Sequence, residues 1–551
     1  MTLSARLESA ATGRGSITFV GSAAGGTTPE RVDWSQLHDE ARAMAVVLAG
    51  HGVGRGTHVG VLGPTSRPLV TALQAIWLGG ATVVALPLPM RLGSIEGFVA
   101  QTRRRIEGAD LAVVLVDPEL AGFLDAPPGV DVVTLDVLAD RARNARATLF
   151  SRAADDPDRL AILQFTSGST AEPKGVMLPD RCITANIDAI VEAAAIGPND
   201  RAVSWLPLYH DMGLIGLLLT PMLNGLDLVL GAPQDFLASP AVWLEWITHY
   251  RGTVTAGPNF SYALAARAMR RASGLDLSSW RLALNGAEPV DPDAVESFCA
   301  AGAPHGLDDK SAFCVFGMAE ATLAVTFPEL GSGLGVDVVD RVALEGERVA
   351  HPVAPDDERA RRLTVLGSAL RDFELRIVEP ASGDTLPERA VGELQVRSPS
   401  VTPGYYRNPA ATAAAFDDGW LRTGDLAYLA GDELVVCGRL KDMIIVGGRN
   451  VFPEDVERAA AAVEGVRVGN VIAFSSERRR GREAIVVVAE ARAEDPGTVR
   501  AAVKSRVSDA VGIPPVDIVL VEPGSLPKTS SGKLQRSLCA ARYHADELQP
   551  V

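Results

Sequence analysis

Basic side chains are scarce in this chain relative to acidic ones. The 551 residues include 52 Lys and Arg against 68 Asp and Glu, so the formal net charge is −16. Such a balance repels a nucleic acid backbone, because affinity for that backbone comes from basic groups that displace its counterions. We therefore expect no nucleic acid partner. A small anion remains possible, since backbone N–H groups and a few cations act at short range.

Cysteine is also rare, and long apolar runs are missing. The five cysteines form no CxxC pair, so neither a zinc site nor a redox couple is indicated, and we interpret them as buried thiols: Cys182, Cys299, Cys314, Cys437 and Cys539. The apolar stretches at 77–90 and 214–230 are interrupted by Gly, Pro, Asn or Asp and predict core segments rather than an integral membrane segment. The first twenty residues lack an apolar signal region, so we expect a cytoplasmic protein.

The length and the order of patterns predict an α/β protein with at least two domains. An amphipathic helix at Leu37–His51 is followed by an expected strand at His58–Gly63, a helix at Arg67–Leu78 and a strand at Ala81–Leu86. This alternation favours parallel sheets covered by helices. Short apolar runs continue it at Thr253–Ala256, Leu282–Leu284 and Ala312–Val315.

The character of the chain changes after Gly392, where short β segments such as GELQVRS and DELVVCGR begin. A boundary is expected close to Arg439–Asp442, followed by a compact α/β unit of about a hundred residues. We predict a large N-terminal domain of parallel sheets covered by helices at 1–438 and a small C-terminal α/β domain at 439–551.

One segment carries most of the chemical information. In LQFTSGSTAEPKGVML, Leu163–Leu178, an expected strand leads into a hydroxyl- and glycine-rich turn and then into Lys174. Gly168 and Gly175 allow close backbone approach, and Lys174 is a mobile positive charge. The hydrogen-bond donors are Thr166, Ser167, Ser169 and Thr170. A polyphosphate needs all three features: the glycines, the hydroxyl donors and the lysine. The alternative, a Ser/Gly-rich surface turn, would leave Lys174 unexplained. The Walker pattern GxxxxGK[ST] is absent here.

This stretch resembles the phosphate-binding signature T-S-G-S-T-G-x-P-K-G of adenylate-forming enzymes, with Ala171 in place of the sixth-position Gly. Further motifs in the order typical of that superfamily are SWLPLYHDMGLIG, NGAEPV, FGMAEATL, RTGDLAYL, GRLKDMIIVGGRNVFPEDVE and LPKTSSGKLQR. Together with the phosphate-binding stretch, these make seven signatures. Two of them, WLPLYHDMGLIG and FGMAEATL, are most similar to those of the fatty acyl-AMP ligases.

The resemblance implies a role for each matching residue. It places ATP against Thr166, Ser167, Gly168, Ser169, Thr170 and Lys174, and the adenine beside Asn285, Gly286, Ala287, Glu288, Phe316, Gly317 and Met318. Asp425 would hold the ribose hydroxyls, Arg439 a second ribose or phosphate contact, and Glu320 would be the Mg²⁺ ligand, since this hard cation prefers carboxylate oxygen. Lys441 would be the hinge on which a mobile C-terminal domain turns.

Two further residues are expected to act on the reacting groups. Lys533 matches the catalytic lysine, whose ammonium would stabilise charge that grows on the phosphates in the transition state. His210 would line the acyl channel and hold the carboxylate in line for attack. Taken alone, Lys533 would be interpreted as a solvated tail residue, and an ordinary structural histidine is the alternative for His210.

The implied reaction joins a fatty acid to AMP with release of pyrophosphate, using ATP and Mg²⁺. The long segment between Glu320 and Gly367 resembles an insertion that restrains the C-terminal domain in acyl-AMP ligases; the alternative is a solvated loop without that role. If this segment restrains the C-terminal domain, the acyl group would pass to an acyl carrier protein, often one that serves polyketide or nonribosomal peptide synthesis. The alternatives are a fatty acyl-CoA synthetase and an inactive acyl-nucleotide binding protein.

Overall fold

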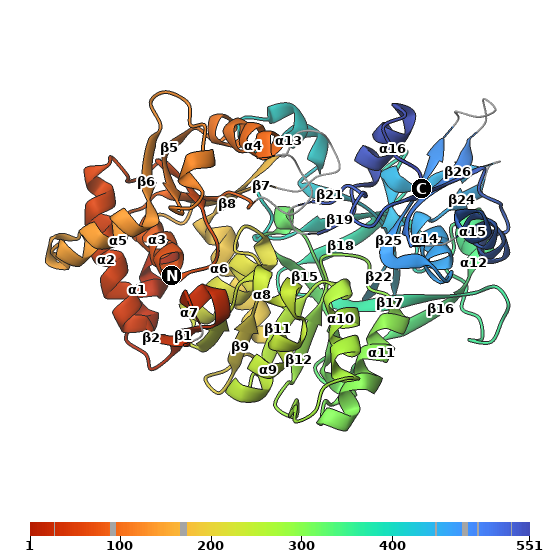
Figure 1. The fold of residues 1–551 in the computed structure, drawn as a ribbon, viewed down its shortest axis with the longest axis horizontal. Coiled ribbons are helices and arrows are strands. Elements are labelled where there is room, and N and C mark those ends of the chain that lie inside the picture. The colour runs from red at the N-terminus through yellow and green to blue at the C-terminus, as the bar shows by residue number, and fades with distance from the viewer. Residues whose placement is uncertain are drawn as a thin grey trace.

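The computed structural model describes residues 1–26, 28–88, 95–165, 174–446, 449–476, 483–492, 495–529 and 532–551. It confirms the predicted α/β class, with parallel sheets covered by helices and a smaller unit at the C-terminal end (Figure 1). No helix within these ranges is both long enough and apolar enough to span a bilayer.

The first sheet has seven strands in the order β13-β12-β11-β9-β10-β1-β2, and all but the edge strand β2 are parallel to their neighbours. Its strands are β1 (Ser16–Phe19), β2 (Glu30–Asp33), β9 (Arg201–Ser204), β10 (Asp227–Leu230), β11 (Val254–Gly257), β12 (Leu282–Asn285) and β13 (Ala312–Cys314). The predicted strands at 253–256, 282–284 and 312–315 are confirmed as neighbours within it.

The second sheet has six strands in the order β6-β5-β3-β4-β7-β8, parallel except for the last pair. Its strands are β3 (His58–Leu62), β4 (Thr82–Ala85), β5 (Leu111–Val116), β6 (Asp131–Thr134), β7 (Leu160–Phe165) and β8 (Gly175–Pro179). Strands β3 and β4 are buried at every position, as expected for a parallel sheet with helices on both faces.

The third sheet has nine strands and is antiparallel throughout. It begins at Phe316, well before the change of character predicted at Gly392. Its strands are β14 (Phe316–Gly317), β15 (Ala324–Phe327), β16 (Val336–Asp340), β17 (Ala360–Ala369), β18 (Glu374–Val378), β19 (Gly392–Arg397), β20 (Phe416–Asp417), β21 (Trp420–Ala430) and β22 (Glu433–Arg439).

Helices cover the two parallel sheets. Figure 1 places α1, α2, α3 and α5 at the end of the molecule away from the C-terminal unit, and α9, α10 and α11 beside β9, β11 and β12. The helices before residue 440 are α1 (Leu3–Ala10), α2 (Trp34–Gly50), α3 (Arg67–Leu78), α4 (Ile95–Gly108), α5 (Leu135–Asn144), α6 (Asp180–Ala193), α7 (Thr220–Leu223), α8 (Pro233–Ala238), α9 (Ala241–Tyr250), α10 (Asn259–Met269), α11 (Pro292–Gly302), α12 (Arg341–Gly346) and α13 (Pro409–Ala415).

The C-terminal residues build a core of their own. The strands are β23 (Ile444–Val446), β24 (Arg449–Val451), β25 (Val466–Ser476), β26 (Ala484–Ala491) and β27 (Asp517–Val521), and the helices are α14 (Pro453–Ala461), α15 (Pro496–Val511) and α16 (Arg536–His544). In α15, Val499, Val503, Val507 and Val511 recur every four residues and form the buried face. Gly512 ends the helix in the left-handed conformation, with φ 72°. The boundary between 438 and 439 itself stays a prediction.

Candidate active site

A cavity of about 3130 Å³ lies among the three sheets and the C-terminal unit. Its walls come from β7, β12, β14, β21 and β22 and from residues 524–529 and 532–538. The lining contains more Lys and Arg than Asp and Glu side chains, although the chain as a whole is acidic. This local reversal of charge suits an anionic ligand.

Most of the predicted site residues meet in this cavity. They are Lys174, His210, Gly286, Ala287, Glu288, Phe316, Gly317, Met318, Glu320, Asp425, Arg439, Lys441 and Lys533. Asn285 is buried at the end of β12, next to the lining residue Gly286, and Thr166–Thr170 lie outside the described residues. The structure thus brings Lys174 and Lys533 to one space, while the chemical role of each residue stays a prediction.

Asp425 and Arg439 form the first charged pair of the cavity. They are register partners on β21 and β22, and Arg439 Nε lies 2.9 Å from Asp425 Oδ1. Burial raises the pKa of Asp425, although Arg439 acts in the opposite direction. Within the described residues, Asp425 Oδ2 and Asn285 Oδ1 are buried and have no hydrogen-bond partner. Such atoms need a donor, and the hydroxyl or amino groups of a nucleoside would supply one.

The turn after β12 is conformationally unusual. Ala287 has φ 69°, in the left-handed region that residues with a Cβ rarely adopt. The Glu288 Oε1 accepts a hydrogen bond of 2.7 Å from the backbone N–H of Phe260 at the start of α10. Burial raises the pKa of Glu288 above its usual value. Strained backbone of this kind is typical of ligand sites.

Glu320 and Lys174 are joined by a tyrosine. Tyr405 donates its hydroxyl to Glu320 Oε1 at 2.9 Å, and Lys174 Nζ lies 4.8 Å from the centre of the Tyr405 ring. Burial, and then the nearby Glu320 carboxylate, raises the pKa of Tyr405, so its hydroxyl remains a donor. The sequence analysis did not single out Tyr405, since nothing in the pattern GYYRN distinguishes it from Tyr406.

His210 and Lys533 approach each other through Asp211, which sequence reasoning also missed. His210 Nδ1 lies 2.6 Å from Asp211 Oδ1, and the Met212 N–H approaches the same nitrogen at a longer 3.4 Å. The shorter contact with the carboxylate favours a proton on Nδ1, which leaves Nε2 for a ligand. Burial acts to raise the pKa of Asp211, but His210 and Lys533 outweigh it and the pKa is lowered. Burial lowers the pKa of Lys533, whereas Asp211 and Glu288 act to raise it. A π-helix, η4 (Met212–Leu219), follows directly, and such turns are frequent at functional sites.

The segment between Glu320 and Gly367 contacts the C-terminal unit. It forms β16, α12 and most of β17, and Glu345 on α12 pairs with Arg449 on β24 at 2.5 Å. Arg361 on β17 pairs with Asp455 on α14 at 2.9 Å, and its guanidinium lies 4.1 Å from the centre of the Phe452 ring. The alternative of a solvated loop is wrong for Glu345 and Arg361, because both residues are buried.

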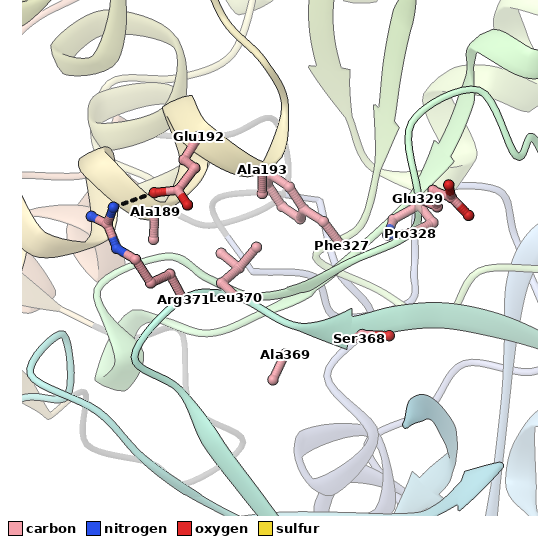
Figure 2. A pocket seen from close by; sticks show the side chains of 10 residues that line it. All are labelled: Ala189, Glu192, Ala193, Phe327, Pro328, Glu329, Ser368, Ala369, Leu370 and Arg371. Carbon is pink, nitrogen blue, oxygen red and sulfur yellow. Dashed lines mark hydrogen bonds and ion pairs between the residues drawn. The ribbon is translucent and has the colours of Figure 1, made fainter. Parts of the chain in front are cut away.

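A second, smaller pocket of about 260 Å³ lies between α6, β15 and β17. Figure 2 shows the ion pair of Glu192 with Arg371 at one side and Phe327 at the other. Phe327 also lines the large cavity. None of the predicted site residues lines this pocket, so the candidate active site is the large cavity.

The fold and the cavity are those of an adenylate-forming enzyme, and comparison with known proteins agrees. A family model described as AMP-binding enzyme matches residues 7–406, and this chain belongs to that family. A solved fatty acyl-adenylate ligase, from a study of these enzymes in E. coli and L. pneumophila, superimposes with a TM-score of 0.91 at 32% identity over 99% of this chain and 98% of the other.

Several curated relatives are similar over nearly their whole length. A putative ligase of Mycobacterium tuberculosis is 40% identical over 92% of this chain and 94% of its own. The putative fatty-acid–CoA ligase FadD25 of the same species is 32% identical (94% and 92%), and the medium-chain-fatty-acid–[acyl-carrier-protein] ligase JamA of Moorena producens is 31% identical (93% and 90%). The chain is thus an adenylate-forming fatty acyl ligase, a class that uses ATP, and the names of its relatives divide over the acceptor.

Proposed function

We propose that this chain converts a fatty acid and ATP into acyl-AMP and pyrophosphate, and then transfers the acyl group to the phosphopantetheine thiol of an acyl carrier protein. The observation that carries the first step is the meeting of Lys533, from the C-terminal unit, with Lys174 and Asp425 in one cavity. A carrier protein as acceptor is in keeping with the name of the relative JamA.

In the first step, a carboxylate oxygen attacks the α-phosphorus of ATP. A bond forms between this oxygen and the phosphorus, and the bond from the phosphorus to the pyrophosphate oxygen breaks, so that the electron pair leaves with pyrophosphate. Negative charge grows on the transferring and leaving oxygens, and the Lys533 ammonium stabilises it. Asp211 would orient the His210 ring through Nδ1, and the other ring nitrogen, Nε2, would hold the substrate carboxylate.

The nucleotide would be held from three sides. Asp425 Oδ2 accepts from the ribose, Lys174 pairs with the phosphates, and Glu288 and Phe316 border the base. Glu320 fits a Mg²⁺ ion, because an oxygen ligand beside a triphosphate is the donor set that this ion takes in ATP sites. Bound there, Mg²⁺ would supply charge neutralisation for the phosphates.

The contacts of α12 and β17 with the C-terminal unit favour a carrier protein over coenzyme A. Formation of a CoA thioester in this superfamily would need the C-terminal unit to turn away from the pose that presents Lys533. The Glu345–Arg449 pair and the Arg361–Asp455 pair oppose such a turn. A fatty acyl-CoA synthetase is the second candidate, because the relative FadD25 carries that name.

Pyrophosphate release tests the proposal. The purified chain is incubated with MgATP and saturated acids of increasing length, first alone, then with CoA, and then with a carrier protein bearing phosphopantetheine. We expect acid-dependent pyrophosphate and a thioester on the carrier protein. Acyl-CoA formed as fast as acyl-AMP would identify a CoA synthetase instead. Absence of pyrophosphate with every acid would leave an acyl-nucleotide binding protein.

A further inference from the structure

Tyr405 lies between two charged residues of the large cavity, Glu320 and Lys174. Its hydroxyl donates to Glu320 Oε1 at 2.9 Å, and its ring face lies beneath Lys174 Nζ, 4.8 Å from the ring centre. A phenol is suited to both contacts, because its O–H donates to an anion while its ring face attracts a cation. One side chain therefore touches the anionic and the cationic member of the site.

The position of Tyr405 is fixed by the backbone around it. The side chain is 8% exposed, and its backbone N–H donates to Thr412 Oγ1 at 3.0 Å. The N–H of Tyr406 donates to the carbonyl of Gly175, the residue after Lys174, at 2.8 Å. The loop that carries Tyr405 is thus hydrogen-bonded to the strand that begins directly after Lys174.

The same loop is also bonded to the backbone of the carboxylate residue. The N–H of Thr402 donates to the carbonyl of Glu320 at 2.8 Å, so the main chain and the side chain of Glu320 are each held by residues 402–405. A charged group that is held before its ligand arrives loses less conformational freedom when it binds.

We propose that Tyr405 is a positioning residue of the nucleotide site, which holds the Glu320 carboxylate through its hydroxyl and the Lys174 ammonium through its ring before MgATP binds. This inference rests on the proposed function, since it assigns Glu320 to the cation and Lys174 to the phosphates. It separates the two contacts by chemistry: the hydroxyl governs the metal requirement, and the ring governs affinity for the phosphates themselves.

Tyr405→Phe and Tyr405→Leu distinguish these contacts. Calorimetry measures binding of a non-hydrolysable ATP analogue in EDTA and over a series of free Mg²⁺ concentrations. Tyr405→Phe keeps the ring, so we expect affinity in EDTA within twofold of the wild type. Mg²⁺ increases affinity for the analogue, and we take the free Mg²⁺ concentration that gives half of this increase as the metal requirement. In Tyr405→Phe this concentration should rise about tenfold, because one hydrogen bond to a charged group is lost. Tyr405→Leu should also weaken binding in EDTA severalfold.

Tyr406→Phe is the matched control. It removes the neighbouring hydroxyl, which donates to Asp110 at the same distance of 2.9 Å, and we expect it to leave both measurements unchanged. A double-mutant cycle with Glu320→Gln adds a readout that a merely structural role would not move: in the Glu320→Gln background, Tyr405→Phe should have no further effect on the Mg²⁺ requirement.

The outcomes separate this inference from the proposed function. If the wild type binds the analogue with Mg²⁺ dependence and Tyr405→Phe does not alter that dependence, the positioning role is refuted. An equal shift in Tyr406→Phe, or a shift that persists in full in the Glu320→Gln background, refutes it as well. If the wild type itself fails to bind the analogue, the proposed function fails.

Discussion

Glu345→Ala tests whether α12 restrains the C-terminal unit. The Glu345 side chain is 1% exposed, and its Oε2 lies 2.5 Å from Arg449 Nη2. The backbone carbonyl of Glu345 accepts a separate bond of 3.1 Å from Asn450, which the substitution leaves in place. Arg449 is 39% exposed and keeps a bond of 3.0 Å to the carbonyl of Val511, so its charge is not left unpaired. The substitution also removes a longer ion pair within α12, in which Arg341 Nη1 lies 3.7 Å from Glu345 Oε1.

The expected effect is modest in size. A hydrogen bond to a charged group contributes about 1.5–3 kcal/mol to stability. We take the lower value, because burial of the Glu345 carboxylate costs free energy that offsets part of the stabilisation. This cost is visible in the raised pKa of Glu345 and in its Oε1, which has no hydrogen-bond partner among the described residues. A loss of about 1.5 kcal/mol shifts the ratio of docked to undocked C-terminal units about tenfold. The Arg361–Asp455 pair remains and prevents full release.

Two measurements follow this shift. Spin labels on the exposed Leu149 and Val516, in a chain with the partly exposed Cys299 replaced by Ala, report the distance between the two units. We expect the undocked fraction to rise about tenfold in Glu345→Ala, and acyl-CoA formation from added acyl-AMP and CoA to rise by a similar factor. Pyrophosphate release should stay within about threefold of the wild type, since the docked pose still dominates.

Glu347→Ala is the control, because Glu347 directly follows α12, its side chain is 69% exposed, and the one ion pair described for that side chain is a 3.7 Å contact with His351. It should alter neither the distances nor the products. An unchanged distance distribution in a correctly folded Glu345→Ala chain would refute the restraint, and with it the structural reason for preferring a carrier protein over CoA.

Three further predictions concern the cavity. Lys533→Ala should lower the rate of adenylate formation about 10²- to 10³-fold, because the ammonium acts mainly in the transition state. ATP binding measured by calorimetry should be nearly unchanged, and an undiminished rate would contradict the catalytic role. Because burial lowers the pKa of Lys533 below its ordinary 10.5, kcat/KM should fall as pH rises through that lowered pKa, and Lys533→Arg should move this alkaline limb upwards. Asp425→Ala should raise the KM for ATP about tenfold or more through loss of a charged hydrogen bond, whereas a KM unchanged in steady-state assays would exclude the ribose contact.

Local patterns predicted the elements well where one physical preference dominates. The helix expected at Arg67–Leu78 and the strand expected from His58 are present with nearly those bounds. The helix has a long apolar period and the strand a short β-branched run, and each pattern favours one type of element. The antiparallel third sheet was located only from Gly392 onwards. Its earlier strands, such as β14 with two residues, are too short to produce a pattern of their own.

The predicted site depended on ordered motifs rather than on chemistry read from single residues. Lys533 looks like a solvated tail lysine until the C-terminal unit is docked, and Asp425 looks like a turn residue until β21 and β22 are paired. Tyr405 and Glu345 could not be found in this way. Each contacts a residue 85 or 104 positions away in the sequence, and no local pattern encodes such a pairing.

The cost of burying Lys533 suggests how the two proposed steps are ordered. Burial lowers its pKa, so docking of the C-terminal unit places an ammonium where water solvates it poorly. The negative charge of a bound triphosphate offsets this cost, so the attraction is largely consumed in desolvating the ammonium, and little net affinity for ATP is lost when Lys533 is removed. When pyrophosphate leaves, most of that charge leaves with it, and docking is favoured less. The C-terminal unit is therefore held most firmly while the adenylate forms, and the hold weakens only after pyrophosphate has left, which places acyl transfer second.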